Sequence, residues 1–505
     1  MSPASAGEPI PGLGRVVGIE TEYGITSAWT APATSGEVRQ APLNVEDAVK
    51  EIFRHTPQRH RAAHHFLRNG GRLYVDIGSH PEIAGPECLH LDDLLAQDQA
   101  GDLILARMLR IANQHLPERI PGARIHLLKS NADSYGNTFG CHENYQFRRD
   151  VNLPMGGFVS FLAARQILIG AGALPGGNLS GHTQPLTDTT TRPLQAMLYS
   201  ARAEFMKASA SADPTHERAF VNTRDEPHAD KSRWRRLHVI AGDSAMSEAT
   251  TAVKVVLGAG VLDQIENHGW DLADIELVDP VAATNAWNLD PLTPMARKRG
   301  SDITCPELLE IALEKVAQVQ RGDDEMAARA LDVARRGITA LQTGDHSLVA
   351  TELDWAIKFE ILSHIAAQSP QGWMSPKVLR TELAFHDISP ATGLSARLRK
   401  AGLMQTWSTP EAILAATDTP PRDTRAQVRG AFVTAVEETN RVASVGWAHV
   451  RLDRPARPQV DLPEPLQATS EQADALIAEI YELGLAGEAP PPPRPAPIDA
   501  PGWRR

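Results

Sequence analysis

The chain has 505 residues, 42% of them hydrophobic and 22% charged, with a formal net charge of -12 at pH 7. This composition predicts a globular protein with one large domain and a smaller one, and the acidic balance disfavours nucleic acid or an anionic membrane as a partner. The three cysteines, Cys88, Cys141 and Cys305, are too widely spaced for a disulfide framework or a zinc site, so a reducing cytoplasmic location is expected.

Both ends of the chain differ in composition from the rest. Residues 1–13 have neither a basic start nor an apolar run, so they predict a flexible leader rather than a secretion signal. Residues 486–505 are rich in proline and predict an extended, disordered tail. Because no uncharged apolar stretch approaches the roughly 20 residues that span a bilayer, a membrane-inserted protein is not expected.

Strand-like and helical stretches are mixed between these ends without a fixed repeat, which predicts an α+β fold. Helical patterns cover residues 91–116 and 351–368, and the apolar side chains of the second recur every four positions, as in a helix packed on a larger body. The strand-like runs are residues 15–26, 72–77, 123–130, 142–147 and 235–242. We expect a large domain over residues 14–404 and a small C-terminal domain over residues 405–485.

The first strand-like run, RVVGIETEYGIT, carries two carboxylates of the same parity. Side chains two residues apart share one face of a strand, so Glu20 and Glu22 point to one side. The other side presents Val17, Ile19 and Tyr23. This pattern predicts a strand with one core face and one acidic face.

The second run, RLYVDI, divides in the same way. Its apolar face consists of Leu73, Val75 and Ile77, and its other face carries Arg72, Tyr74 and Asp76. An exposed sheet face normally mixes lysine, threonine and serine, so repeated carboxylates favour a polar cavity instead.

Further carboxylates follow directly, because the turn GSHPE presents Glu82 and Glu87 lies five residues later. Four or five carboxylates in one cavity would repel one another by several kcal/mol unless cations lay among them. Mg²⁺ is the expected cation, since it prefers oxygen ligands and accompanies nucleotide phosphates.

Two other runs bring histidine and arginine to a strand face. His142 and Asn144 share one face, as do Arg236 and His238. Each histidine either completes a metal or phosphate site or is a satisfied, half-buried imidazole. Arg224 and the cluster Arg233, Arg235 and Arg236 have the charge to neutralise phosphate, although a solvated surface is the favoured interpretation of the cluster alone.

No GxxxxGK[ST] loop and no strand-linked GxGxxG motif is present, so a nucleotide would have to be held by metal, arginine and sheet. No GxSxG motif is present either, which disfavours a nucleophilic hydrolase.

Several long motifs resemble those of one known family. These are GIETEYGIT, FLRNGGRLYVDIGSHPE, GCHENY, VNTRDEPHAD, RRLHVIAGDSAMSE, ELDWAIK, ELAFHDI and PPRDTRAQVRG, in this order. Over residues 15–452 the chain resembles the Pup ligase and depupylase family, relatives of glutamine synthetase, and GIETE, DIGSHPE and GCHENY resemble its ligase branch. The resemblance implies a glutamine-synthetase-like curved antiparallel sheet packed with helices, and a small C-terminal domain that completes the nucleotide site.

The resemblance also implies an activity. With ATP and Mg²⁺, such a ligase joins the C-terminal glutamate γ-carboxylate of Pup, a prokaryotic ubiquitin-like protein, to a lysine of a protein substrate through an acyl phosphate. Its partners would be Pup and lysine-bearing proteins, with a functional link to the proteasome. The alternatives are a depupylase or Pup deamidase on the same fold, and a diverged ligase that uses another carboxylate and amine, since residues 174–200 depart from the family pattern.

Site roles follow from the same resemblance, motif by motif. Asp76 resembles the base that deprotonates the lysine. The nucleotide contacts would be Arg72, Gly85 and Trp447, although Gly85 stands where the pattern has a threonine, so only its backbone can serve. The metal site would contain Glu20, Glu82 and Tyr74, with Glu22, His142 and His238 completing the metal and phosphate shell.

Overall fold

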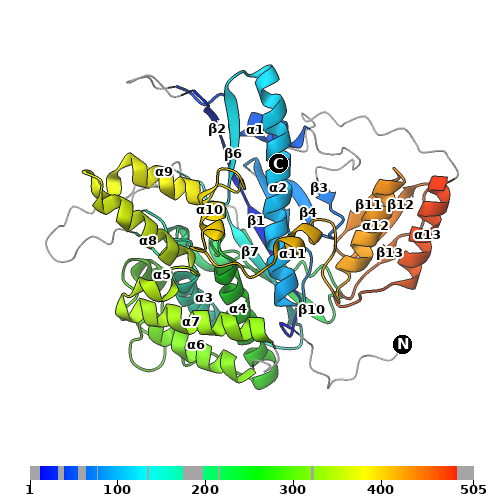
Figure 1. Cartoon of the computed structure of the whole chain (residues 1–505). Helices are drawn as coiled ribbons and strands as arrows, with labels where there is room; N and C mark the ends of the chain where they lie inside the picture. The colour runs from blue at the N-terminus through cyan, green and yellow to red at the C-terminus, as the bar shows by residue number, and fades with distance from the viewer. Residues whose placement is uncertain are drawn as a thin grey trace.

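The computed structural model describes residues 12–31, 39–54, 64–76, 78–133, 136–174, 197–213, 217–319 and 324–485. The predicted leader, except residues 12 and 13, and the predicted tail lie outside the described residues, as does Ile77. The α+β class is confirmed, because strands and helices are intermixed along the chain and pack into one body (Figure 1).

A large sheet forms the centre of the molecule. Among the described residues it has eight strands in the order β3-β4-β5-β1-β7-β10-β9-β8. Its neighbours pair antiparallel, as the prediction of an antiparallel sheet requires, except for the parallel pair β8 and β9. The strands are β1 (Val17–Glu22), β3 (His64–Phe66), β4 (Arg72–Asp76), β5 (His80–Ala84), β7 (Cys141–Arg148), β8 (Ala208–Ser211), β9 (Ala219–Asn222) and β10 (Trp234–Val239).

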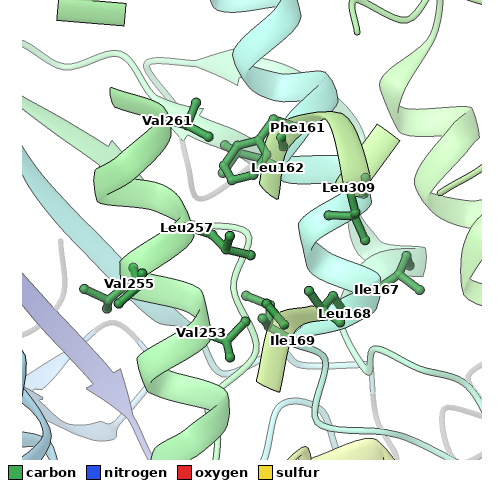
Figure 2. Close-up of a cluster of buried hydrophobic side chains, with 14 of the residues drawn as sticks. Phe161, Leu162, Ile167, Leu168, Ile169, Val253, Val255, Leu257, Val261 and Leu309 are labelled. Carbon is green, nitrogen blue, oxygen red and sulfur yellow. The ribbon is translucent and has the colours of Figure 1, made fainter. Parts of the chain in front are cut away.

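One face of this sheet is covered by apolar helices. Alternate residues of β1 and β7, such as Val17 and Tyr145, are fully buried and join the main core. Figure 2 shows how α3 (Met155–Leu168), α4 (Glu248–His268) and α6 (Cys305–Val319) interlock in this core through side chains such as Phe161, Leu257 and Leu309. A buried side chain of this size contributes roughly 1.5–3 kcal/mol, so the core holds this face of the sheet rigid.

A second apolar cluster lies beneath the long helix α2 (Leu91–Arg119), which crosses in front of the sheet in Figure 1. Here α2 and α1 (Val45–Phe53) pack on the separate antiparallel pair β2 (Gly24–Trp29) and β6 (Ala123–Leu128). The predicted helices at residues 91–116 and 351–368 are observed as α2 and α8 (Asp354–Ala367).

The remaining helices cover one side of the molecule. Figure 1 shows α5 and α7 beside α3, α4 and α6, with α9 and α10 above them. Their bounds are α5 (Pro280–Leu289), α7 (Glu325–Thr343), α9 (Pro376–Phe385) and α10 (Leu394–Lys400). The short helix α11 (Pro410–Ala415) lies apart from them, and short 3-10 turns are found at Ala203–Phe205, His346–Val349 and Gly372–Met374. Within the ranges described, no helix combines the length and the apolar character that are needed to cross a membrane.

The C-terminal unit has a core of its own, which is drawn from residues 428–480. It consists of α12 (Ala426–Glu438), α13 (Glu471–Leu485) and the sheet of β11 (Val442–Gly446), β12 (His449–Arg454) and β13 (Val460–Asp461). The preceding α11 packs on α2 instead, with Ala416 against Ala96 and Ala100. The division at residue 405 stays a prediction, because α11, which follows it, packs on α2 of the large domain rather than on the core of the C-terminal unit.

Candidate functional site

The face of the sheet opposite the core gathers the predicted site residues. Glu22 of β1 lies directly opposite Glu82 of β5, and Tyr74 of β4 lies opposite the same Glu82. On the other side of β1, Glu20 is paired with His142 of β7. Because directly opposed residues of antiparallel strands share a face, four neighbouring strands contribute to one polar surface.

Two groups of donor side chains form on this surface. Glu20, His142 and His238 make one group, and Glu22, Asp76 and Glu82 make the other. Within each group the possible ligand atoms lie within 4.8 Å of one another. The second group offers only carboxylate oxygens, the ligands that Mg²⁺ prefers, so the donor set fits the cation that was predicted.

Glu20 is held in its ionised form. One of its oxygens accepts a hydrogen bond of 3.0 Å from Asn144, and the other lies 3.2 Å from His142 Nδ1 and 3.6 Å from His238 Nε2. Burial by itself would raise the pKa of Glu20, but the interactions with the imidazoles of His142 and His238 outweigh it and hold this pKa well below its usual value.

The pKa of Glu82 is shifted in the opposite direction to that of Glu20. Its burial, together with the negative charges of Glu20, Glu22 and Asp76, raises the pKa of this carboxyl well above its usual value. The Tyr74 hydroxyl donates a hydrogen bond to it. A bound divalent cation would offset the repulsion among these carboxylates, so the site favours the binding of a cation.

Two hollows adjoin these groups. The first is a pocket of about 620 Å³, counting the open space at its mouth, that lies between the sheet and the C-terminal unit with Glu20, Arg236 and Trp447 in its wall. The second is a larger hollow of about 2680 Å³, whose wall includes Glu22, Asp76 and His142. The carboxylates thus stand between the first pocket, which contains Glu20 in its wall, and the larger hollow, which contains Glu22 and Asp76.

Two of the predicted nucleotide contacts line the first pocket, and the third, Arg72, lies on β4 opposite Ala84 of its wall. Trp447 is in the turn of the β11–β12 hairpin, and Gly85 lines the same pocket. The Gly85 N–H donates to Ile19 O at 2.8 Å, so a ligand could meet only the carbonyl or the Cα of this residue. The Arg72 guanidinium lies 4.7 Å from the Tyr74 ring centroid, and its buried Nε has no hydrogen-bond partner among the described residues.

The arginine cluster does not act as one surface. Arg236 points into the site, where it donates to Asn144 at 2.7 Å and lies 3.7 Å from Glu20. Arg233 points away and forms an ion pair of 2.8 Å with Glu464 of the C-terminal unit. The solvated-surface interpretation is therefore wrong for Arg236, whose side chain is only 16% exposed, and fits Arg233, which is 55% exposed.

The expectation that Glu87 joins the other carboxylates needs correction. Glu87 lies in the wall of the first pocket, but it forms ion pairs with Arg425 and Arg429. Burial would raise its pKa, yet these two charges lower the pKa of Glu87 to about 2. The two arginines lie in PPRDTRAQVRG, a motif whose role was not predicted, because nothing local links it to residue 87.

Arg202 is another residue that the sequence patterns did not single out. It lines the large hollow, and its Nη1 donates to the carbonyls of Ile240 and Gly242 at 2.8 and 2.9 Å. Its backbone N–H is one of five groups that donate to the buried Asp243 carboxylate. This network fixes the floor of the large hollow beside Glu22.

Comparison with known proteins identifies relatives over nearly the whole chain. The model of the family described as Pup-ligase protein matches residues 15–451. The Pup–protein ligase of Corynebacterium efficiens is 36% identical over 475 residues, which are 92% of this chain and 94% of that protein. The Pup–protein ligase of Nocardia farcinica is 36% identical over 479 residues, which are 92% of this chain and 99% of that protein.

Solved structures agree with this. The ligase PafA in complex with the prokaryotic ubiquitin-like protein Pup matches with a TM-score of 0.81 and 32% identity, over 93% of this chain and 92% of that one. The Pup ligase PafA in complex with ADP matches with a TM-score of 0.75 and 32% identity, over 90% of this chain and 98% of that one. The resemblance drawn from the motifs is thereby confirmed, and this chain belongs to the Pup-ligase protein family.

Proposed function

We propose that this protein is an ATP-dependent ligase that joins the γ-carboxylate of the C-terminal glutamate of Pup to a lysine of a protein substrate. The observation that carries the proposal is the pair of donor groups, built on Glu20 and on Glu22, that stand between the pocket lined by Trp447 and a larger hollow. Family membership, and relatives whose structures contain Pup or ADP, support it. The products would be proteins marked for a proteasome in the cytoplasm.

Mg²⁺ would be held by Glu20 and Glu82, with Glu22, His142 and His238 completing the shell. The ligand atoms of Glu20, His142 and His238 lie within 4.8 Å of one another, as do those of Glu82, Glu22 and Asp76, so the donors form two neighbouring groups that would each hold an ion. Bound there, the cation would neutralise phosphate charge. Tyr74 would orient Glu82 through the hydrogen bond that its hydroxyl donates.

ATP would lie in the pocket beneath the C-terminal unit. Trp447 offers an indole face to the base, Arg72 offers a guanidinium to the phosphates, and Gly85 offers its backbone. We add Arg236 to these contacts, because it lines the pocket beside Glu20. The N-terminal end of α12, with Arg425, closes the same pocket.

The reaction would proceed in two displacements. A carboxylate oxygen of the Pup glutamate attacks the γ-phosphorus of ATP, ADP leaves, and an acyl phosphate results. The lysine nitrogen then attacks the acyl carbon, the C–O bond to phosphate breaks, and an isopeptide bond forms as phosphate leaves. Phosphorylation is needed because a free carboxylate has a poor leaving group.

Asp76 would accept the proton of the lysine in the second displacement. A lysine ammonium has a pKa of about 10.4, roughly 3 units above neutral pH, so a nearby carboxylate that accepts its proton assists the attack. Asp76 meets the positional requirement, because it belongs to the group with Glu22 and Glu82 and also lines the large hollow.

The test is a conjugation assay with purified components. The protein is incubated with Pup that ends in glutamate, ATP, Mg²⁺ and a lysine-bearing protein, and the products are separated on a denaturing gel. An ATP-dependent band at the summed mass of Pup and substrate supports the proposal. Release of Pup from a preformed conjugate, without any conjugation, would contradict it and favour the depupylase alternative.

A further inference from the structure

Glu87 joins the large sheet to the C-terminal unit. It follows β5, and its carboxylate accepts hydrogen bonds from Arg425 Nε at 2.8 Å, from Arg429 Nη1 at 3.3 Å and from Arg429 Nη2. The two arginine side chains are only 3% and 0% exposed. Such a desolvated, bidentate pair has a defined geometry, so the first two turns of α12 are held at a set place against the sheet.

Arg429 carries this link onward to Trp447. Its Nε donates to Gly70 O at 2.8 Å and its Nη1 donates to Trp447 O at 2.9 Å. Its guanidinium carbon lies 4.9 Å from the centroid of the Trp447 ring and 5.7 Å from that of the Phe66 ring. One side chain thus contacts both the backbone and the ring of Trp447.

The surroundings leave the indole little freedom. The Phe66 and Trp447 rings meet edge to face, with centroids 5.1 Å apart. The loop before β4 closes on α12, because Gly70 has a φ of +80° and a Cβ there would lie 2.8 Å from Ala426 O. The orientation of the Trp447 ring therefore depends on contacts with the large sheet as much as on the hairpin that carries it.

We propose that Arg429, held by Glu87, is a positioning residue that sets the Trp447 ring for stacking of the nucleotide base. Arg429 is absent from the wall of the pocket, whereas Trp447 belongs to it, so Arg429 acts through the indole. A flat guanidinium over one ring face leaves the other face for a base, and a lysine ammonium cannot provide the same flat support. The inference rests on the proposed function, because it requires a nucleotide in this pocket.

The test compares Arg429→Lys with Arg422→Lys. Arg422 is a matched control, since it also joins this segment to the large domain, through Asp92 and Asp93 at 2.6 and 3.0 Å, but its side chain is 54% exposed and it does not contact Trp447. The measurements are the Kd of ADP by calorimetry, KM and kcat for ATP in conjugation, and the ratio of activity with ATP to activity with GTP.

Arg429→Lys is expected to bind ADP roughly tenfold more weakly, since stacking of one base on an aromatic ring has about that effect. KM for ATP should rise, kcat at saturating ATP should change little, and the preference for ATP over GTP should narrow. Arg422→Lys should retain the wild-type values. A purely structural role would instead lower the thermal midpoint and leave the Kd of ADP unchanged.

Wild-type affinity for ADP in folded Arg429→Lys would overturn the inference, while a wild-type protein that binds no ADP would overturn the proposed function itself. If Arg429→Lys does not fold, the Kd of ADP for Phe66→Leu tests the inference instead. This variant removes the ring whose edge contact sets the tilt of Trp447, and it should weaken ADP binding in the same way. Unchanged ADP binding in folded Phe66→Leu would also contradict the inference.

Discussion

The carboxylate of Glu20 and the imidazole of His142 lie directly opposite each other on neighbouring antiparallel strands, with 3.2 Å between Oε2 and Nδ1. Two positions further along β1, Glu22 lies opposite Glu82 of the other neighbouring strand. One strand therefore provides a carboxylate to each of the two donor groups. This arrangement places the groups side by side, as a reaction between a triphosphate and a carboxylate requires.

Asp76→Asn should abolish conjugation while leaving nucleotide binding intact. Loss of a general base lowers a rate by about 100-fold or more, and Asp76 faces the large hollow rather than the nucleotide pocket. The measurements are the initial rate of conjugate formation on a gel and the Kd of ADP. Asp133→Asn, which removes another carboxylate from the same hollow, is the control and should keep most of the activity. Normal conjugation by Asp76→Asn would contradict its proposed role.

Glu82→Gln should raise the Mg²⁺ concentration that gives half-maximal activity, by roughly tenfold or more. The variant removes a ligand charge from the all-carboxylate group but keeps the shape of the side chain. Tyr74→Phe should have a smaller effect, because it removes only the hydrogen bond that orients Glu82. Titration of the conjugation rate with Mg²⁺ measures both effects, and excess EDTA should stop the wild-type reaction. Equal Mg²⁺ dependence in Glu82→Gln and the wild type would rule out Glu82 as a ligand.

Arg236→Met and Arg233→Met should behave differently although the residues are three positions apart. Arg236 lines the nucleotide pocket beside Glu20, whereas Arg233 pairs with Glu464 on the surface. ADP binding should weaken by about 10- to 150-fold in Arg236→Met, since a charge-assisted contact to phosphate contributes on the order of 1.5–3 kcal/mol. Arg233→Met should bind ADP as the wild type does. Calorimetric titration measures the Kd of ADP for both variants. An equal loss of ADP affinity in both would indicate a general effect of surface charge and would contradict a specific role for Arg236.

Lys358→Met should destabilise the protein. The Lys358 ammonium is buried and donates to Gly172 O at 2.7 Å and to Glu382 at 2.8 Å, and it lies 2.9 Å from His386 Nε2. Removing it would leave the Glu382 carboxylate with only His386, at 3.4 Å, as a partner, at a cost of at most about 3–5 kcal/mol. Urea unfolding should show this loss, and the double variant Lys358→Met, Glu382→Leu should recover part of it. A single variant as stable as the wild type would show that the ammonium contributes no net stability.

Low pH should weaken the ion pairs that Glu87 forms with Arg425 and Arg429. The pKa of this carboxyl is lowered to about 2 against 4.5 in an unfolded chain, because the charges of Arg429 and Arg425 outweigh its burial. A lowered pKa stabilises the folded state fully above pH 4.5, and this contribution, at most about 3 kcal/mol, is lost as the pH falls towards 2. The difference in unfolding free energy between the wild type and Glu87→Gln should therefore shrink as the pH falls below about 4.5. A difference that stays constant down to pH 3 would contradict the assignment.

Much of this site could be predicted from local sequence pattern. The alternation in RVVGIETEYGIT places Glu20 and Glu22 together and buries Val17 and Tyr23, as the structure shows. The same parity separates Leu73 from Tyr74. These predictions succeed because the two-residue period of a strand is a property of the backbone and needs no knowledge of its neighbours.

The tertiary structure alone decides which strands are neighbours. Glu22 meets Glu82, and Glu20 meets His142, across 60 and 122 residues of chain. Glu87 finds Arg425 and Arg429 across 338 and 342 residues. Alternation predicts the face of Arg236, but only the register places it opposite Gln146 of β7 and 3.7 Å from Glu20. Strand order and register depend on how distant segments pack on a shared core, so short-range periodicity can determine the face of a side chain but not its partner.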